Sequence, residues 1–162
     1  MDIASIQWSL QTILKHFFSR VGNIDNIGMA FSAALDHNPG IISLYDRIVF
    51  NKVYINDGNS YNNATGIFTA PYDGAYMLSF FIAEFQPGQI VTRLMLDGVN
   101  SVDSVAESID SDHNDHGGNV VILKLNMGQQ VWIETYNTDN VHISAAYNYL
   151  YDTFSGFLLY GL

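Results

Sequence analysis

The sequence predicts one all-β domain of the sandwich, barrel or jelly-roll type, preceded by a short helical leader. From residue 28 onward, apolar side chains alternate with a period of two, and turn residues recur every eight to twelve positions. Phe and Tyr contribute ten residues each, and such rings suit the half-buried faces of strands. The 162 residues, 48% of them hydrophobic, suffice for one domain with a sizeable core and exclude global disorder.

The chain begins with a segment, residues 1–27, that we expect to be a helical leader and a joint. Its apolar residues recur at spacings of three and four: Ile3, Ile6, Leu10, Ile13 and Phe17. This is the spacing of a helix face and of coiled-coil core positions. The helix is either a short oligomerising stalk, for which Ile-rich core positions favour trimers, or an amphipathic helix packed on its own domain. Breaker residues at 22–27 separate it from the domain at 28–162.

That domain contains a series of short strand candidates. They are Met29–Leu35, Ile41–Tyr45, Ile48–Ile55, Gly66–Ala70, Gly74–Glu84, Val91–Asp97, Ser101–Glu107, Asn119–Leu125, Gln130–Tyr136, Val141–Tyr147 and Phe154–Gly161. Tight-turn sequences separate them, among them Asn56-Asp57-Gly58-Asn59, Gln86-Pro87-Gly88 and Asn126-Met127-Gly128. Many short strands without a second helix predict a sandwich, a barrel or a jelly roll.

Four blocks of the domain resemble the C1q globular head domain. They are Met29–Ala33 (MAFSA), residues 50–80, Gly128–Ile133 (GQQVWI) and Thr153–Tyr160 (TFSGFLLY). The second block carries FTAP and GAY at the family spacing, and the last is similar to the family's closing strand nearly letter for letter. The blocks occur in the family's order and extend the resemblance over about residues 28–162. The related tumour-necrosis-factor ligands share the fold but lack the FSGF ending.

The resemblance implies a ten-stranded jelly-roll β-sandwich of the C1q and tumour-necrosis-factor type. It also implies secretion, homotrimers that associate through apolar, aromatic faces, and binding rather than catalysis. Many family members carry a collagen-like Gly-X-Y stalk, whereas this sequence has the short helical leader in that place. The matched residues are expected to specify the fold and the trimer packing and not to form a reactive site.

The segment between residues 97 and 115 is the most acidic part of the chain. Clustered carboxylates repel one another unless a cation or solvent separates them, and hard oxygen ligands suit Ca²⁺. The candidate calcium ligands are Glu107, Asp110, Asp112 and Asp115. The resemblance supports this choice, because family members often bind calcium through acids near the trimer apex, and Asp115 stands before a pair of small residues as a family acid does. The alternative is a solvated acidic loop without an ion.

Two further groups are candidate ligand-binding residues. His113 and His116 lie among the acids, and two imidazoles with a carboxylate could also hold Zn²⁺. Tyr147, Tyr149 and Tyr151 alternate before the last predicted strand, which would place three phenols on one face. Flat aromatic faces with a polar edge suit sugar stacking and protein recognition. The alternative for the tyrosines is a partly buried strand face.

Composition excludes several classes of protein. A formal net charge of -10, with six Lys and Arg in all, disfavours nucleic-acid binding, which needs clustered cations. The absence of cysteine excludes a disulfide scaffold and a Cys nucleophile. No run approaches the roughly 18 apolar residues that span a bilayer, so membrane insertion is not expected, and the N-terminus lacks the basic start of a signal peptide. No catalytic motif occurs, and we expect no enzymatic activity.

These features favour a secreted, lectin-like pattern-recognition protein of innate immunity. It would bind glycans or microbial surface molecules as a trimer, with avidity added to weak single sites and with Ca²⁺ in the acidic loop. The alternative is a secreted signalling or assembly ligand that binds a protein receptor or matrix partner through its trimer faces.

Overall fold

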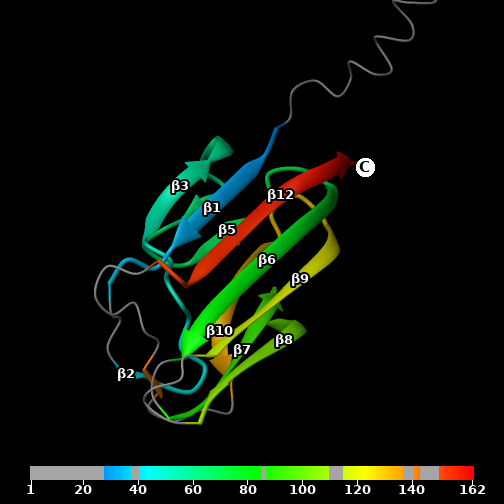
Figure 1. Ribbon diagram of the computed structural model, residues 1–162. Coiled ribbons are helices and arrows are strands. Elements are labelled where there is room, and N and C mark those ends of the chain that lie inside the picture. Colours follow the sequence, from blue (N-terminus) through cyan, green and yellow to red (C-terminus); the bar gives the residue numbers. More distant parts are fainter. Residues whose placement is uncertain (1–27, 38–40, 85–86, 110–114, 137–140, 143–149) are drawn as a thin grey trace, which may run out of the picture.

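Strands make up most of the computed structural model, which describes residues 28–37, 41–84, 87–109, 115–136, 141–142 and 150–162 (Figure 1). The predicted leader helix at residues 1–27 lies outside these ranges. The strands are β1 (Ala30–Ala34), β2 (Ile41–Ile42), β3 (Lys52–Asn56), β4 (Tyr61–Asn62), β5 (Ile67–Thr69), β6 (Gly74–Glu84), β7 (Gly88–Leu96), β8 (Val99–Ser108), β9 (Asp115–Leu125), β10 (Gln130–Tyr136), β11 (Val141–His142) and β12 (Thr153–Gly161). A 3₁₀ turn, Asp57–Asn59, follows β3.

Two five-stranded antiparallel sheets form a sandwich. The β12 sheet has the strand order β3-β1-β12-β6-β9, and the β10 sheet has the order β4-β5-β10-β7-β8. Figure 1 shows β12 and β6 side by side in the first sheet, with β10 and β7 behind them. The short strands β2 and β11 pair separately. This is the ten-stranded jelly-roll sandwich that the sequence predicted.

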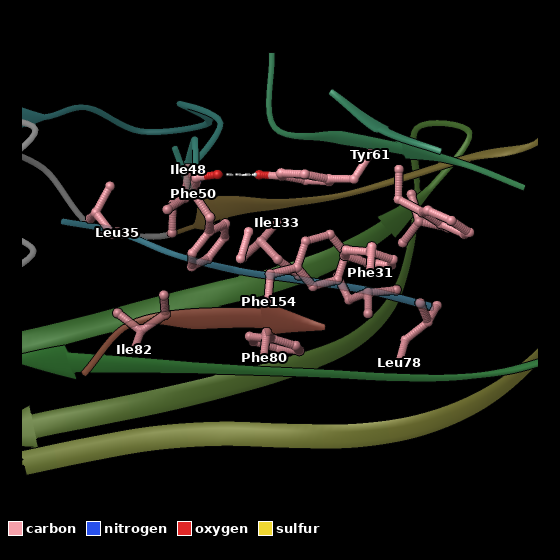
Figure 2. Close-up of a cluster of buried hydrophobic side chains, with 14 of the residues drawn as sticks. Phe31, Leu35, Ile48, Phe50, Tyr61, Leu78, Phe80, Ile82, Ile133 and Phe154 are labelled. Atoms are coloured by element: carbon pink, nitrogen blue, oxygen red, sulfur yellow. Dashed lines mark hydrogen bonds between the residues drawn. The ribbon is translucent and has the colours of Figure 1, made fainter. Parts of the chain in front are cut away.

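Aromatic rings and aliphatic side chains together fill the core between the two sheets (Figure 2). Alternate residues of β6 are buried: Tyr76, Leu78, Phe80 and Ile82. Phe31 of the β12 sheet stacks on Phe68 of the β10 sheet with ring centroids 4.6 Å apart, and it meets Phe154 edge-on at 4.8 Å. The buried Tyr61 hydroxyl donates a hydrogen bond of 3.0 Å to the Phe50 carbonyl oxygen. These contacts join the sheets and leave the Tyr61 hydroxyl with a partner.

Several strand boundaries differ from the prediction. β6 and β10 have the predicted limits, whereas β4 was not predicted, and β3 begins at Lys52 instead of residue 48. β9 begins at Asp115, four residues before the predicted Asn119. Gly117 and Gly118 lie in this early part of β9, and because neither has a side chain, they contribute nothing to a hydrophobic alternation. Of the predicted strand at 141–147, only residues 141–142 are described.

Candidate functional site

The face of the β12 sheet that points away from the core carries a row of apolar side chains. In register across adjacent strands lie Phe157 of β12, Met77 of β6 and Ile122 of β9. Val120 and Phe81 continue the surface toward the start of β9. Ile122 is 61% exposed and Phe157 43%, although both sit in the middle of strands. We call Met77, Phe81, Val120, Ile122 and Phe157 the apolar outer face; contiguous exposed surfaces of this kind mark sites of association.

A hydrogen bond between serines lies within this face. Ser32 of β1 and Ser155 of β12 are directly opposite one another, and their hydroxyl oxygens are 2.8 Å apart. The same row continues to Ser79 of β6. Because the Ser32 and Ser155 hydroxyl groups hydrogen-bond to each other, a second protein surface could exclude water from the β1 side of the sheet at a small cost in free energy.

One end of the sandwich gathers acidic residues at the limits of β6, β8, β9 and β12. Glu84, the last residue of β6, is opposite Asp115, the first residue of β9, and His116 is opposite Ala83. Glu107 lies near the end of β8. We call Glu84, Glu107, Asp115, His116 and Asp152 the acidic end.

Two of the four predicted calcium ligands meet at this end. One carboxylate oxygen of Asp115 accepts a hydrogen bond of 3.1 Å from the Glu107 backbone N–H, and the other accepts one of 2.8 Å from the His116 N–H. These two hydrogen bonds, with that of Glu107 the stronger influence, lower the pKa of Asp115. The other two predicted ligands, Asp110 and Asp112, lie outside the described residues. Within the described ranges, no group of three or more His, Cys, Asp or Glu side chains could hold a metal ion.

Two of the predicted ligand-binding residues also come together here. The Nε2 atom of His116 is 3.1 Å from the Tyr151 carbonyl oxygen, so that nitrogen is the donor. The His116 ring stacks on Phe81 with a centroid distance of 5.8 Å. His116 and Tyr151 are exposed and connect the acidic end to the apolar outer face. The other three predicted residues, His113, Tyr147 and Tyr149, lie outside the described residues.

Sequence reasoning missed a pair of buried carboxyl groups. Asp152 is fully buried and Glu84 is 1% exposed. The Asp152 carboxylate accepts a hydrogen bond of 2.7 Å from the Ala83 N–H, and its backbone oxygen accepts one of 3.0 Å from Leu35. Burial, with a smaller contribution from the nearby Glu84 charge, raises the pKa of Asp152 to about 7, against the opposing Ala83 hydrogen bond. No local sequence pattern indicates that Asp152 is buried, because its burial arises where the start of β12 meets the ends of β6 and β1.

The sequence model of the C1q domain matches residues 30–159 of this chain. The caprin-2 of Danio rerio is 32% identical over 140 residues, which are 85% of this chain and 15% of that protein. The hibernation-associated plasma protein HP-25 of Tamias sibiricus is 31% identical over 132 residues, which are 82% of this chain and 58% of that protein. The chain therefore spans only part of the length of each of these relatives.

A solved structure supports the same fold. The globular domain of zebrafish complement 1qA protein superposes with a TM-score of 0.67 at 21% identity, over 83% of this chain and 99% of that domain. No helix in the described part of the chain has both the length and the apolar character needed to cross a membrane.

Proposed function

Because this chain belongs to the C1q domain family, we propose that it is a secreted, homotrimeric recognition protein of innate immunity that binds glycans of microbial surfaces. Domains of this family form trimers and bind partners. The relative HP-25 is a plasma protein by name, which supports secretion. A binding role also agrees with a sequence that has no catalytic motif.

The apolar outer face is the observation that carries the trimeric part of this proposal. Ile122 and Phe157 would expose apolar area to water in a monomer, at a cost of roughly 25 cal/mol per Å². Three copies that pack these faces around a common axis would remove that area from water. The trimer would then present three ligand sites at once, and this adds avidity for the repetitive glycans of a cell surface.

We expect Ile122→Asp to dissociate the trimer without unfolding the domain. Ile122 is largely exposed in the single chain, so the charge costs little there, whereas in the trimer it would be buried without a partner. The trimer dissociation constant should rise about tenfold or more. Light scattering after size-exclusion chromatography should give the mass of three 18.1 kDa chains for the wild-type protein and a lower mass for the variant.

The matched control for this experiment is Val99→Asp. Val99 is 69% exposed and belongs to the β10 sheet, so the same change in charge falls on the opposite side of the sandwich. This control should remain trimeric. A monomeric wild-type protein, or an Ile122→Asp variant with the mass of the wild type, would contradict the assignment of the face.

Calcium at the acidic end is part of the proposal. Glu107 and Asp115 would supply carboxylate oxygens, and each Asp115 oxygen keeps a lone pair beside the hydrogen bond that it accepts. The two carboxylates fit a hard cation, which would neutralise charge at the end of the sandwich. The remaining predicted ligands, Asp110 and Asp112, would complete the set.

Binding of the full chain to immobilised polysaccharides, with calcium and again with a chelator, tests the function. Binding that a chelator abolishes supports a calcium-dependent lectin, and Asp115→Asn should then weaken it about tenfold or more. Binding that survives chelation would support the glycan-binding function and contradict the role of calcium in it. If no polysaccharide binds, the lectin proposal is wrong, and binding to a protein receptor becomes the function to test.

A further inference from the structure

The outward face of the β10 sheet carries a group of aromatic and charged side chains that none of the predicted sites includes. Across neighbouring strands, Glu134 of β10 is opposite Arg93 of β7, and Arg93 is opposite Asp103 of β8. Tyr136 follows two residues after Glu134 on the same face of β10. Tyr45 belongs to the turn beside β10, and its ring centroid lies 5.9 Å from that of Tyr136. We call these five residues the Tyr45 platform.

Tyr45 has a backbone conformation that is unfavourable for a tyrosine. Its φ angle is 65°, in the left-handed region that bulky residues rarely occupy. Its side chain is nevertheless 59% exposed, so burial of the ring does not compensate for the strain. Strain of this kind at an exposed aromatic residue points to function, since a glycine or asparagine would serve the turn better.

Hydrogen bonds from β10 hold this turn in place. The Thr135 hydroxyl donates to the Ser43 carbonyl oxygen at 2.6 Å, and the Thr135 carbonyl oxygen accepts from the Tyr45 N–H at 3.1 Å. The Thr135 N–H donates to the Asp46 carbonyl oxygen at 3.0 Å, and the Asp46 carboxylate accepts from the Ser43 N–H at 2.8 Å. The turn is therefore rigid, and a ligand would meet a ring that is already positioned.

The other residues of the Tyr45 platform supply hydrogen-bond donors and acceptors. The Arg93 guanidinium carbon lies 3.0 Å from the Tyr136 ring centroid, and its Nε donates to Asp103 at 3.0 Å. Glu134 accepts a hydrogen bond of 2.8 Å from the Trp132 indole N–H. A planar donor group and two carboxylates thus lie on the same sheet face as Tyr136, whose ring neighbours the exposed Tyr45 ring, and this combination suits the hydroxyl pairs and the apolar C–H face of a sugar.

The charges indicate which glycans fit. Arg93 and the nearby Arg47, whose guanidinium lies over Trp132 at 4.9 Å, carry two positive charges. Asp103 and Glu134 carry two negative charges, so the surface has no net attraction for phosphate or sulfate. The exposed large hydrophobic side chains at the turn are Leu44 and Tyr45, an apolar patch of the size that one sugar ring covers.

We propose that the Tyr45 platform is a calcium-independent site for neutral glycans, on the side of the sandwich opposite the apolar outer face. This inference rests on the proposed glycan-binding function and adds to it a second glycan site, separate from the calcium site proposed at the acidic end. The positive charge of Arg93 already balances Asp103 in an ion pair of 3.0 Å, and Glu134 accepts from the Trp132 indole N–H, so the site needs no added cation. In a trimer built through the β12 sheets, all three copies of the platform stay accessible.

The test uses Tyr45→Gly in the full chain, with mannan and laminarin as neutral probes and heparin as a sulfated probe, in the presence of a chelator. Glycine relieves the left-handed strain, so the melting temperature should stay the same or rise. Affinity for the neutral polysaccharide that the wild type binds should fall about tenfold or more. Heparin should not compete.

The matched control is Tyr54→Ala, because Tyr54 is 56% exposed but belongs to β3 of the other sheet. This variant should keep wild-type affinity. Unchanged glycan binding by Tyr45→Gly would overturn the site while leaving the glycan-binding function in place. A wild-type protein that binds neither neutral probe under chelation would overturn it as well, and heparin competition that depends on Tyr45 would refute the preference for neutral glycans.

Discussion

Gly117→Ala is expected to destabilise the domain strongly. Gly117 lies in β9 at the edge of the β12 sheet, where it faces β8 at the edge of the β10 sheet. A Cβ atom there would collide with the Val105 carbonyl group and lie 2.9 Å from the Ala106 backbone nitrogen. Because both obstacles are backbone atoms, no rotamer change can relieve the collision, and the two sheet edges would have to separate.

The expected loss in the free energy of unfolding is about 3 kcal/mol or more. For a domain of this size, that lowers the melting temperature by about 10 °C, which thermal unfolding followed by circular dichroism would measure. Gly28→Ala is the matched control, since a Cβ atom at Gly28 meets nothing within 4 Å, and its effect should stay within about 0.5 kcal/mol. A wild-type melting temperature for Gly117→Ala would show that the sheet edges are not in contact at this point.

The sequence predicted the parts of the fold in which side chains show a period. β6 was predicted to the residue because buried side chains such as Tyr76 and Phe80 alternate with more exposed ones from Tyr76 to Ile82. The start of β9 was missed because Gly117 and Gly118 show no period, although the first glycine is the residue that allows the two sheets to meet. β4 has two residues, and only its pairing with β5 defines it as a strand. Such pairing depends on tertiary structure and leaves no local signal.

For the candidate sites too, the sequence indicates the parts that are close along the chain and misses those that tertiary structure brings together. Glu107 and Asp115 are eight residues apart, and the sequence could group them because they flank one short connection; the structure joins them by a hydrogen bond from the Glu107 N–H to the Asp115 carboxylate. The Tyr45 platform could not be predicted, since the hydrogen bond that holds the turn joins Ser43 to Thr135 over 92 positions. The burial of Asp152 likewise depends on strand ends that are distant in sequence, and an isolated aspartate beside a strand gives no sign of it.

Asp152→Asn is expected to become more stable than the wild-type protein as the pH rises from 5 to 8. Burial raises the pKa of Asp152 from 3.8 to about 7, so between these values the folded protein keeps a proton that the unfolded chain has lost. The contribution of this bound proton to the free energy of unfolding is therefore complete below pH 3.8, and the wild-type protein loses it as the pH rises toward 7. Each pH unit in that window costs roughly 1.4 kcal/mol.

Asparagine has no proton to lose and can still accept the hydrogen bond from the Ala83 N–H. The difference in unfolding free energy between Asp152→Asn and the wild type should therefore grow in favour of the variant by about 3 kcal/mol between pH 5 and pH 8. Urea unfolding at each pH measures this difference, and other groups that titrate in both proteins cancel from it. A difference that does not change with pH would show that Asp152 is ionised at its buried position throughout.

Glu84→Gln provides the second variant, because the Glu84 charge is one of the influences that raise the pKa of Asp152. Removing that charge leaves Asp152 buried, so the loss of stability with rising pH should persist but finish at a lower pH than in the wild type. If Asp152→Asn and Glu84→Gln abolish the pH dependence equally, the two carboxyl groups share one proton and titrate as a unit. If Glu84→Gln leaves the pH dependence of the unfolding free energy unchanged, the burial of Asp152 alone raises its pKa. The protein then loses stability with rising pH through the ionisation of this one carboxyl group.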